Sequence, residues 1–84
     1  MRQYYFTFRS VTAAMEGQKA LEKVGIRSSM ARTPMQLRNQ GCGYSLKITE
    51  MSYAAALAIL SKGERHYQKC YERLASGQWQ EVGA

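Results

Sequence analysis

The residue best suited to covalent chemistry in this 84-residue sequence is Cys42, which stands between Gly41 and Gly43. The stretch from residue 23 to residue 49 that contains it has five cations and no acidic residue, namely Lys23, Arg27, Arg32, Arg38 and Lys47. Cations and helix N-termini lower the pKa of a nearby thiol because they stabilise the thiolate. The two glycines leave room for another molecule to approach the sulfur. The pattern is therefore consistent with a nucleophilic thiol.

The same residues also have a purely structural interpretation. A single cysteine in a small protein is often a buried apolar residue, and Gly41 and Gly43 can serve only the turn before a strand. Scattered arginines are often a solvated surface. Cys70 is expected to pack in the interior, and His66 is expected on the surface rather than beside the thiolate. Tyr44 and Tyr67 are the tyrosines that we place nearest to Cys42.

Composition limits the class of protein. Twelve Lys and Arg residues against six Asp and Glu give a net charge of +6, and 45% hydrophobic residues are ordinary for a globular domain. Two cysteines without a CxxC pair and one histidine are too few for a disulfide framework or a structural zinc site, so neither a metal nor a cofactor is expected. The longest apolar run, residues 53–60, is far shorter than the ~20 residues that span a bilayer. We expect a cytoplasmic protein without a membrane segment or signal peptide.

Hydrophobic periodicity predicts six elements in the order strand, helix, strand, strand, helix, strand. Their expected ranges are 3–8, 11–24, 26–32, 44–48, 49–62 and 66–72. The last of these is also compatible with a helix. Gly25 is expected to end the first helix, Thr49 to cap the second, and residues 35–38 to form one helical turn.

This order predicts an α+β fold of the ferredoxin-like βαββαβ type, with a four-stranded antiparallel sheet and two helices on one face. The domain is expected to cover residues 1–74, and residues 75–84 form a C-terminal tail whose Trp79 packs on the body or on a partner. In that arrangement the first strand ends where the third begins, the second strand ends and the first helix starts. We therefore expect the following residues to meet at one rim around Cys42: Arg9, Ser10, Arg32, Thr33, Pro34, Arg38, Gly41 and Gly43.

These residues also carry a resemblance. The chain resembles a small bacterial family, the selenium/sulfur (Se/S) carrier protein-like family, over about residues 3–72. The similarity rests on the order and spacing of five short features: Phe8, Ser10, Gly25, Thr33-Pro34 and Cys42-Gly43. Cys70 and the residues after Leu74 are not part of this pattern.

The resemblance implies a cytoplasmic carrier rather than a turnover enzyme. Cys42 would hold sulfur or selenium as a persulfide or selenosulfide, with Gly43 as its companion and Thr33-Pro34 as the neighbouring loop. Its partners would be a donor protein and an acceptor protein. The resemblance does not say which of the two elements is carried.

Two other functions compete with this hypothesis. A regulatory or interaction module, dimeric through its sheet or through Trp79 and the tail, would show no thiol chemistry. A basic sheet protein with tyrosines could also bind RNA by stacking bases, but the RRM signature is absent from Tyr44–Ile48, so nucleic acid ranks third.

Overall fold

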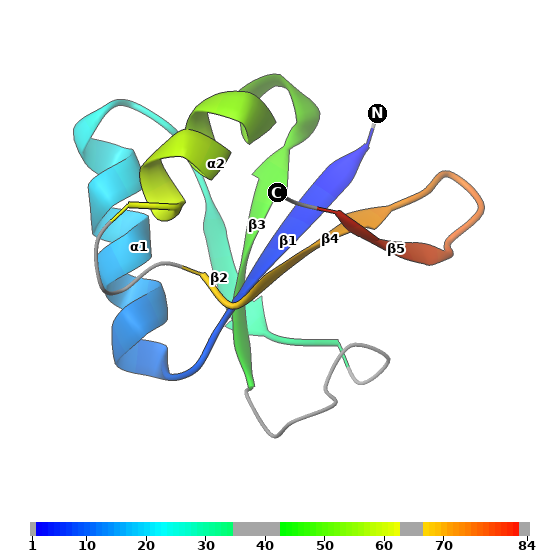
Figure 1. The fold of residues 1–84 in the computed structure, drawn as a ribbon, viewed down its shortest axis with the longest axis horizontal. Coiled ribbons are helices and arrows are strands. Elements are labelled where there is room, and N and C mark those ends of the chain that lie inside the picture. Colours follow the sequence, from blue (N-terminus) through cyan, green and yellow to red (C-terminus); the bar gives the residue numbers. More distant parts are fainter. Residues whose placement is uncertain (1, 35–42, 63–66, 83–84) are drawn as a thin grey trace.

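The computed structural model describes residues 2–34, 43–62 and 67–82, and these form two α-helices and one antiparallel sheet (Figure 1). This confirms the predicted α+β class. In chain order the elements are β1 (Gln3–Phe8), α1 (Val11–Lys23), β2 (Ser29–Arg32), β3 (Tyr44–Thr49), the 3₁₀ turn η2 (Glu50–Ser52), α2 (Tyr53–Leu60), β4 (Lys69–Arg73) and β5 (Trp79–Val82).

The sheet has the strand order β2-β3-β1-β4-β5, and each neighbouring pair is antiparallel. β1 therefore lies between β3 and β4, which are the neighbours that the sequence predicts for it. The prediction of four strands is wrong, because residues 79–82 of the expected tail pair with β4 and add a fifth strand within the described residues. The sheet thus departs from the four-stranded ferredoxin-like arrangement.

The hydrophobic core lies between the helices and one face of the sheet. Side chains alternate between the two faces of a strand, and the register places Phe6 between Leu46 of β3 and Cys70 of β4. All three are fully buried, and both helices contribute to the same cluster through Ala14 and Leu21 of α1 and Ala56 and Leu60 of α2. One sheet face is therefore packed against helices.

The start of β2 differs from the prediction because Ile26 belongs to the end of α1. Gly25 has a φ of +80°, and its N–H donates to Glu22 O at 3.0 Å. The N–H of Ile26 donates to Leu21 O at 2.9 Å, which completes a Schellman motif, and the Ile26 side chain packs against the core. The strand begins only at Ser29 as a consequence.

The second half of the chain also differs in its boundaries. The predicted helix at 49–62 starts with η2, and Thr49 precedes it without a capping hydrogen bond from its side chain. The predicted strand at 66–72 is β4, displaced toward the C-terminus. A turn at Gly77, whose φ is +91°, then joins β4 to β5, and the N–H of Leu74 donates to Gln78 O at 2.8 Å.

Gly17 is a point of close approach between α1, β1 and α2. A Cβ built on it would lie 3.0 Å from Phe8 Cζ and 3.2 Å from Leu60 Cδ2, and Phe8 is fully buried. We expect Gly17→Val to lower the free energy of unfolding by about 1–3 kcal/mol, because the added methyl groups overpack this contact. Urea denaturation measures it. Lys19→Val is the matched control, because it places the same β-branched residue on an exposed site of α1; equal losses in both variants would contradict the close contact.

Candidate functional site

The candidate site begins at the rim of the sheet where β1 and β2 end and β3 starts. Tyr44, the first residue of β3, pairs with Phe8 on one side and with Arg32 on the other. Arg9 and Ser10 directly follow Phe8 in the chain, and Gly43 directly precedes Tyr44. The described residues predicted for this rim are therefore brought to one end of the three strands.

Gly43 is held by the chain that leaves β2. The N–H of Thr33 donates to Gly43 O at 2.7 Å, which extends the pairing of β2 and β3 by one step. A Cβ built on Gly43 would lie 3.7 Å from Nη2 of Arg32, so the guanidinium group lies beside the residue that follows Cys42. Thr33 is buried and Pro34 is half-buried, and this fixes the backbone next to Gly43.

Ser10 acts as the N-cap of α1. Its backbone is extended, with a φ of −151°, and its Oγ accepts a hydrogen bond from the N–H of Ala13 at 3.1 Å. The first turn of α1 contains no acidic residue, so the positive end of the helix dipole is not neutralised there by a side chain of that turn. Arg9, which precedes the cap, is exposed.

Several predicted residues lie outside the described part of the chain. These are Arg38, Gly41, Cys42 and His66, together with the predicted helical turn at 35–38. Their roles stay predictions.

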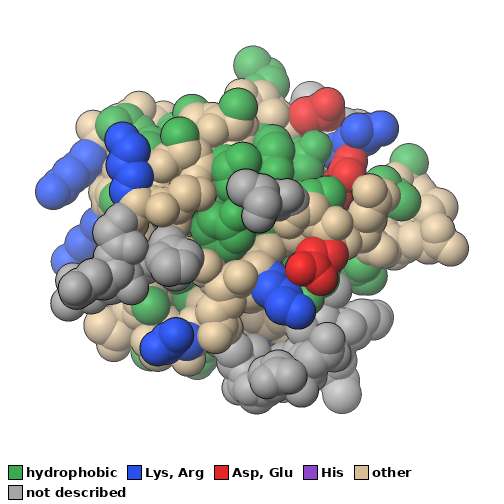
Figure 2. Space-filling model, in the orientation of Figure 1, with side chains coloured by type: hydrophobic (Ala, Val, Ile, Leu, Met, Phe, Trp, Pro, Cys, Tyr) green, Lys and Arg blue, Asp and Glu red, His purple; other side chains and the backbone are tan. Residues whose placement is uncertain are grey.

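The cations of residues 23–49 do not all lie at the rim, and Lys23, Arg27 and Lys47 were not among the residues predicted for it. Among the four that the structure describes, only Arg32 lies at the rim. Lys23 is in the last turn of α1, at the end opposite Ser10, and Lys47 pairs with Tyr5 in the middle of the sheet. Arg27 precedes β2, at the end of that strand opposite Arg32. Figure 2 likewise shows Lys and Arg side chains dispersed over the visible face rather than gathered into one patch.

Cys70, the second thiol, is part of the core, as predicted. It pairs with Phe6 on β1 and Val82 on β5, and its exposed fraction is 0%. Burial, followed by the nearby negative charge of Glu72, raises the pKa of the Cys70 thiol to about 12. A thiol that is buried and protonated is a poor nucleophile, so Cys70 is a packing residue.

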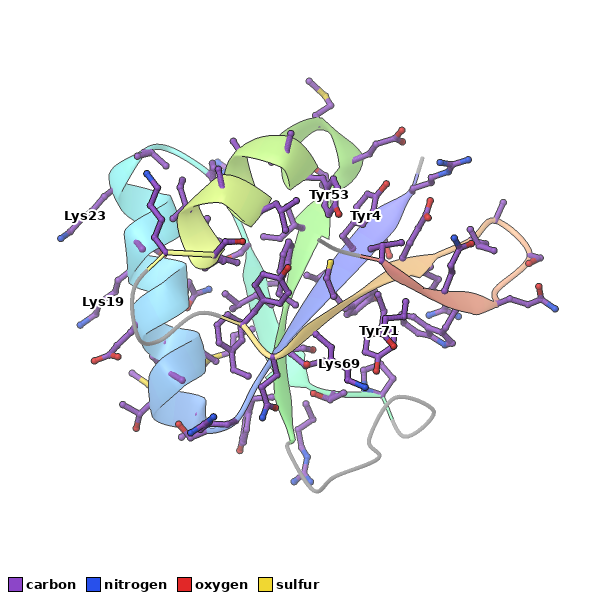
Figure 3. All side chains as sticks on the ribbon, viewed as in Figure 1. Tyr4, Lys19, Lys23, Tyr53, Lys69 and Tyr71 are labelled. Carbon is purple, nitrogen blue, oxygen red and sulfur yellow. The ribbon has the colours of Figure 1, made fainter. Side chains whose placement is uncertain are left out.

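A group of tyrosines surrounds Cys70 on the helix side of the sheet. Tyr4 and Tyr53 stack with ring centroids 3.9 Å apart, and Tyr67 meets Phe6 edge-on at 5.0 Å. Burial, and then the neighbouring Cys70, raises the pKa of the Tyr53 hydroxyl. Tyr44 and Tyr67 pack against the core. Figure 3 shows Tyr4 and Tyr53 directed toward each other, and Figure 2 shows hydrophobic side chains gathered between α2 and β4.

The opposite face of the sheet, which carries Tyr5, Lys47, Arg73 and Trp79, was not predicted as a functional surface. The signal is the alternation of Tyr5 with Tyr4 and Phe6, which requires an aromatic side chain to point away from the core. The partners of Tyr5 on that face come from β3 and β4, and they become visible only once the register is known.

The described residues contain no group of three or more His, Cys, Asp or Glu side chains placed to hold a metal ion. None of the helices in the described ranges is long and apolar enough to cross a bilayer.

Comparison with known proteins adds one match. The family model described as "Putative Se/S carrier protein-like" matches residues 3–72. The match covers β1 through most of β4 and includes every residue predicted for the rim. No curated protein matches the chain.

Proposed function

Because the chain belongs to the Se/S carrier protein-like family, we propose that it holds sulfur or selenium on the thiol of Cys42. The loaded atom is received from a donor protein and passed to an acceptor protein. The site needs an accessible thiol and a positive environment, and an 84-residue domain can supply both without a deep pocket.

The observation that carries the proposal is the position of the Arg32 guanidinium group beside Gly43. Gly43 follows Cys42 in the chain, so the Arg32 guanidinium group lies beside the residue next to the thiol. Together with Arg9, Arg38 and the N-terminus of α1, it would favour the thiolate over the thiol and stabilise the anion of the loaded persulfide. Gly41, Gly43 and the Thr33-Pro34 segment would leave the sulfur open to a partner.

The transfer is a thiol exchange that is balanced in atoms and electrons. The Cys42 thiolate attacks the outer sulfur of a donor persulfide, R–S–SH, so a new Sγ–S bond forms and the donor's S–S bond breaks. The donor leaves as the thiolate R–S⁻, and the proton stays on the transferred sulfur. A nucleophile of the acceptor repeats the step and restores the Cys42 thiolate. For selenium, the outer atom is selenium and the same bonds are exchanged.

The burial of Cys70 supports a carrier that works with one thiol. A resolving cysteine must reach the loaded sulfur, and Cys70 is fully buried between Phe6 and Val82. Release of the sulfur is therefore left to the acceptor rather than to a disulfide within the chain.

The proposal is tested by incubating the protein with a cysteine desulfurase and cysteine and measuring the intact mass. We expect an increase of one sulfur atom that is removed by reductant and maps to Cys42. Cys42→Ala should lose the increase completely, and Cys70→Ala, the matched control, should keep it. Equal loading of Cys42→Ala and the parent protein would end the carrier proposal.

A further inference from the structure

The sheet face that points away from the helices carries a cluster of aromatic and cationic side chains. We call the residues Tyr5, Lys47, Arg73 and Trp79 the open-face cluster. Lys47 of β3 pairs with Tyr5 of β1, and Arg73 of β4 pairs with Trp79 of β5, so the cluster crosses four adjacent strands. Figure 3 shows Lys69 and Tyr71, which share this face, projecting from β4 away from Tyr4 and Tyr53.

The rings of the cluster contact each other and remain partly accessible. Tyr5 meets Trp79 edge-on, with ring centroids 4.9 Å apart, and both side chains are only half-buried. The guanidinium carbon of Arg73 lies 5.1 Å from the centroid of the Trp79 ring. This cation–π contact stabilises the Arg73 guanidinium group near the indole ring.

The charge on this part of the face is positive. Lys47 and Arg73 are exposed. Among the strand residues on this face, the acidic residue is Glu81, which pairs with Tyr71 and forms an ion pair with Lys69 at 3.9 Å. The charges of Lys69 and Glu81 therefore largely cancel. Lys47 and Arg73 then give this part of the face a net positive charge.

We propose that the open-face cluster binds single-stranded nucleic acid. Bases stack on exposed aromatic rings and on guanidinium planes, and lysine and arginine contact the phosphates. The four strands span roughly 14 Å at about 4.8 Å per step, which is room for about two or three stacked bases. An acidic peptide would use the two cations but would gain little from the aromatic rings.

The test measures the anisotropy of a fluorescent 12-nucleotide oligouridine titrated with the full-length protein at several salt concentrations. We expect binding that weakens with salt. The double variant Lys47→Gln, Arg73→Gln should bind at least roughly tenfold more weakly, and its slope of log affinity against log salt should be about 1.4 smaller, at about 0.7 per lost phosphate contact.

The matched control is Lys19→Gln, Lys23→Gln, which removes the same charge from exposed positions of α1 (Figure 3). It should leave the slope unchanged, and circular dichroism is used to check that both double variants are folded. Three results would overturn the proposal. They are equal losses of affinity in the two double variants, no binding at about 50 mM salt, where the Debye length is about 14 Å, and equally tight binding of polyglutamate. Cys42→Ala, which lacks the thiol of the carrier proposal, should still bind the oligouridine. This separates the result from the proposed carrier function.

Discussion

Replacing Phe6 with alanine is expected to lower the free energy of unfolding by about 3–5 kcal/mol. Phe6 is fully buried in the central strand, between Leu46 and Cys70 in the register. Its ring centroid lies 5.0 Å from that of Tyr67 and 6.1 Å from that of Tyr53, so it joins the sheet to α2 and to the segment before β4. Removing the ring leaves a cavity that these neighbours cannot fill without giving up their own contacts.

The loss is large relative to the stability of a domain of this size. At about 0.05–0.15 kcal/mol per residue, a chain of this length is stable by roughly 4–13 kcal/mol. Urea denaturation followed by circular dichroism measures the change, and Phe6→Leu serves as the conservative control because it keeps most of the buried volume. A loss below about 1 kcal/mol in Phe6→Ala would contradict the central position of this ring.

The elements that could be predicted are those whose own residues determine them. β1 and β3 show regular alternation, and Gly25 supplies the positive φ with which α1 ends. The position of β1 between β3 and β4 follows from the order of the elements. In each case the signal lies within a few consecutive residues or in their order along the chain.

The errors arose where contacts distant in sequence decide the structure. Ile26 alternates with Ser28 as in a strand, but its N–H bonds to Leu21 and its side chain packs on the core. Residues 79–82 look like part of a tail until β4 is in place to pair with them, and Tyr5 then packs against Trp79. The bond from Ile26 to Leu21 is local and belongs to the helix end at Gly25. The packing of Ile26 on the core and the pairing of residues 79–82 with β4 depend on residues distant in sequence.

The candidate site could be predicted only where the order of the elements determines the positions of its residues. The meeting of Arg32, Gly43 and Ser10 at one rim follows from the topology, and the structure agrees for these residues. The dispersal of Lys23 and Lys47 does not follow from their closeness to Cys42 in the sequence, because strands and helices carry neighbouring residues to opposite ends. Charge near a residue in sequence is therefore a weak guide to charge near it in space.

The two thiols are expected to differ by about three orders of magnitude in their reaction with an alkylating reagent at pH 8. A thiol with a pKa of about 12 is ionised in roughly one molecule in ten thousand at that pH, whereas an unperturbed thiol near 8.5 is ionised in about a quarter. Burial of Cys70 slows its reaction further. Cys42→Ser isolates Cys70 as the single thiol, and its alkylation is followed by mass spectrometry in the folded state and in guanidinium chloride.

The raised pKa also fixes the pH dependence of stability. As the pH rises above about 9, the thiol of Cys70 loses its proton in the unfolded chain but keeps it in the folded protein up to about 12. Unfolding then releases a proton, so the free energy of unfolding falls by up to about 1.4 kcal/mol per pH unit in this window. Cys70→Ala should show a shallower fall between pH 9 and 10. The hydroxyl of Tyr53, whose pKa is raised from 10.0, is present in both proteins and lowers the stability of both as the pH rises.

Rapid alkylation of folded Cys42→Ser would contradict the burial of Cys70 and would reopen the question of a second reactive thiol. Slow alkylation in the folded state and rapid alkylation in guanidinium chloride would show that only folding protects Cys70. In the folded parent protein, Cys42 would then be the thiol available to hold sulfur. Under the carrier proposal, every release would need an external acceptor, because an internal disulfide could form only after the Phe6–Cys70–Val82 row of the sheet had opened.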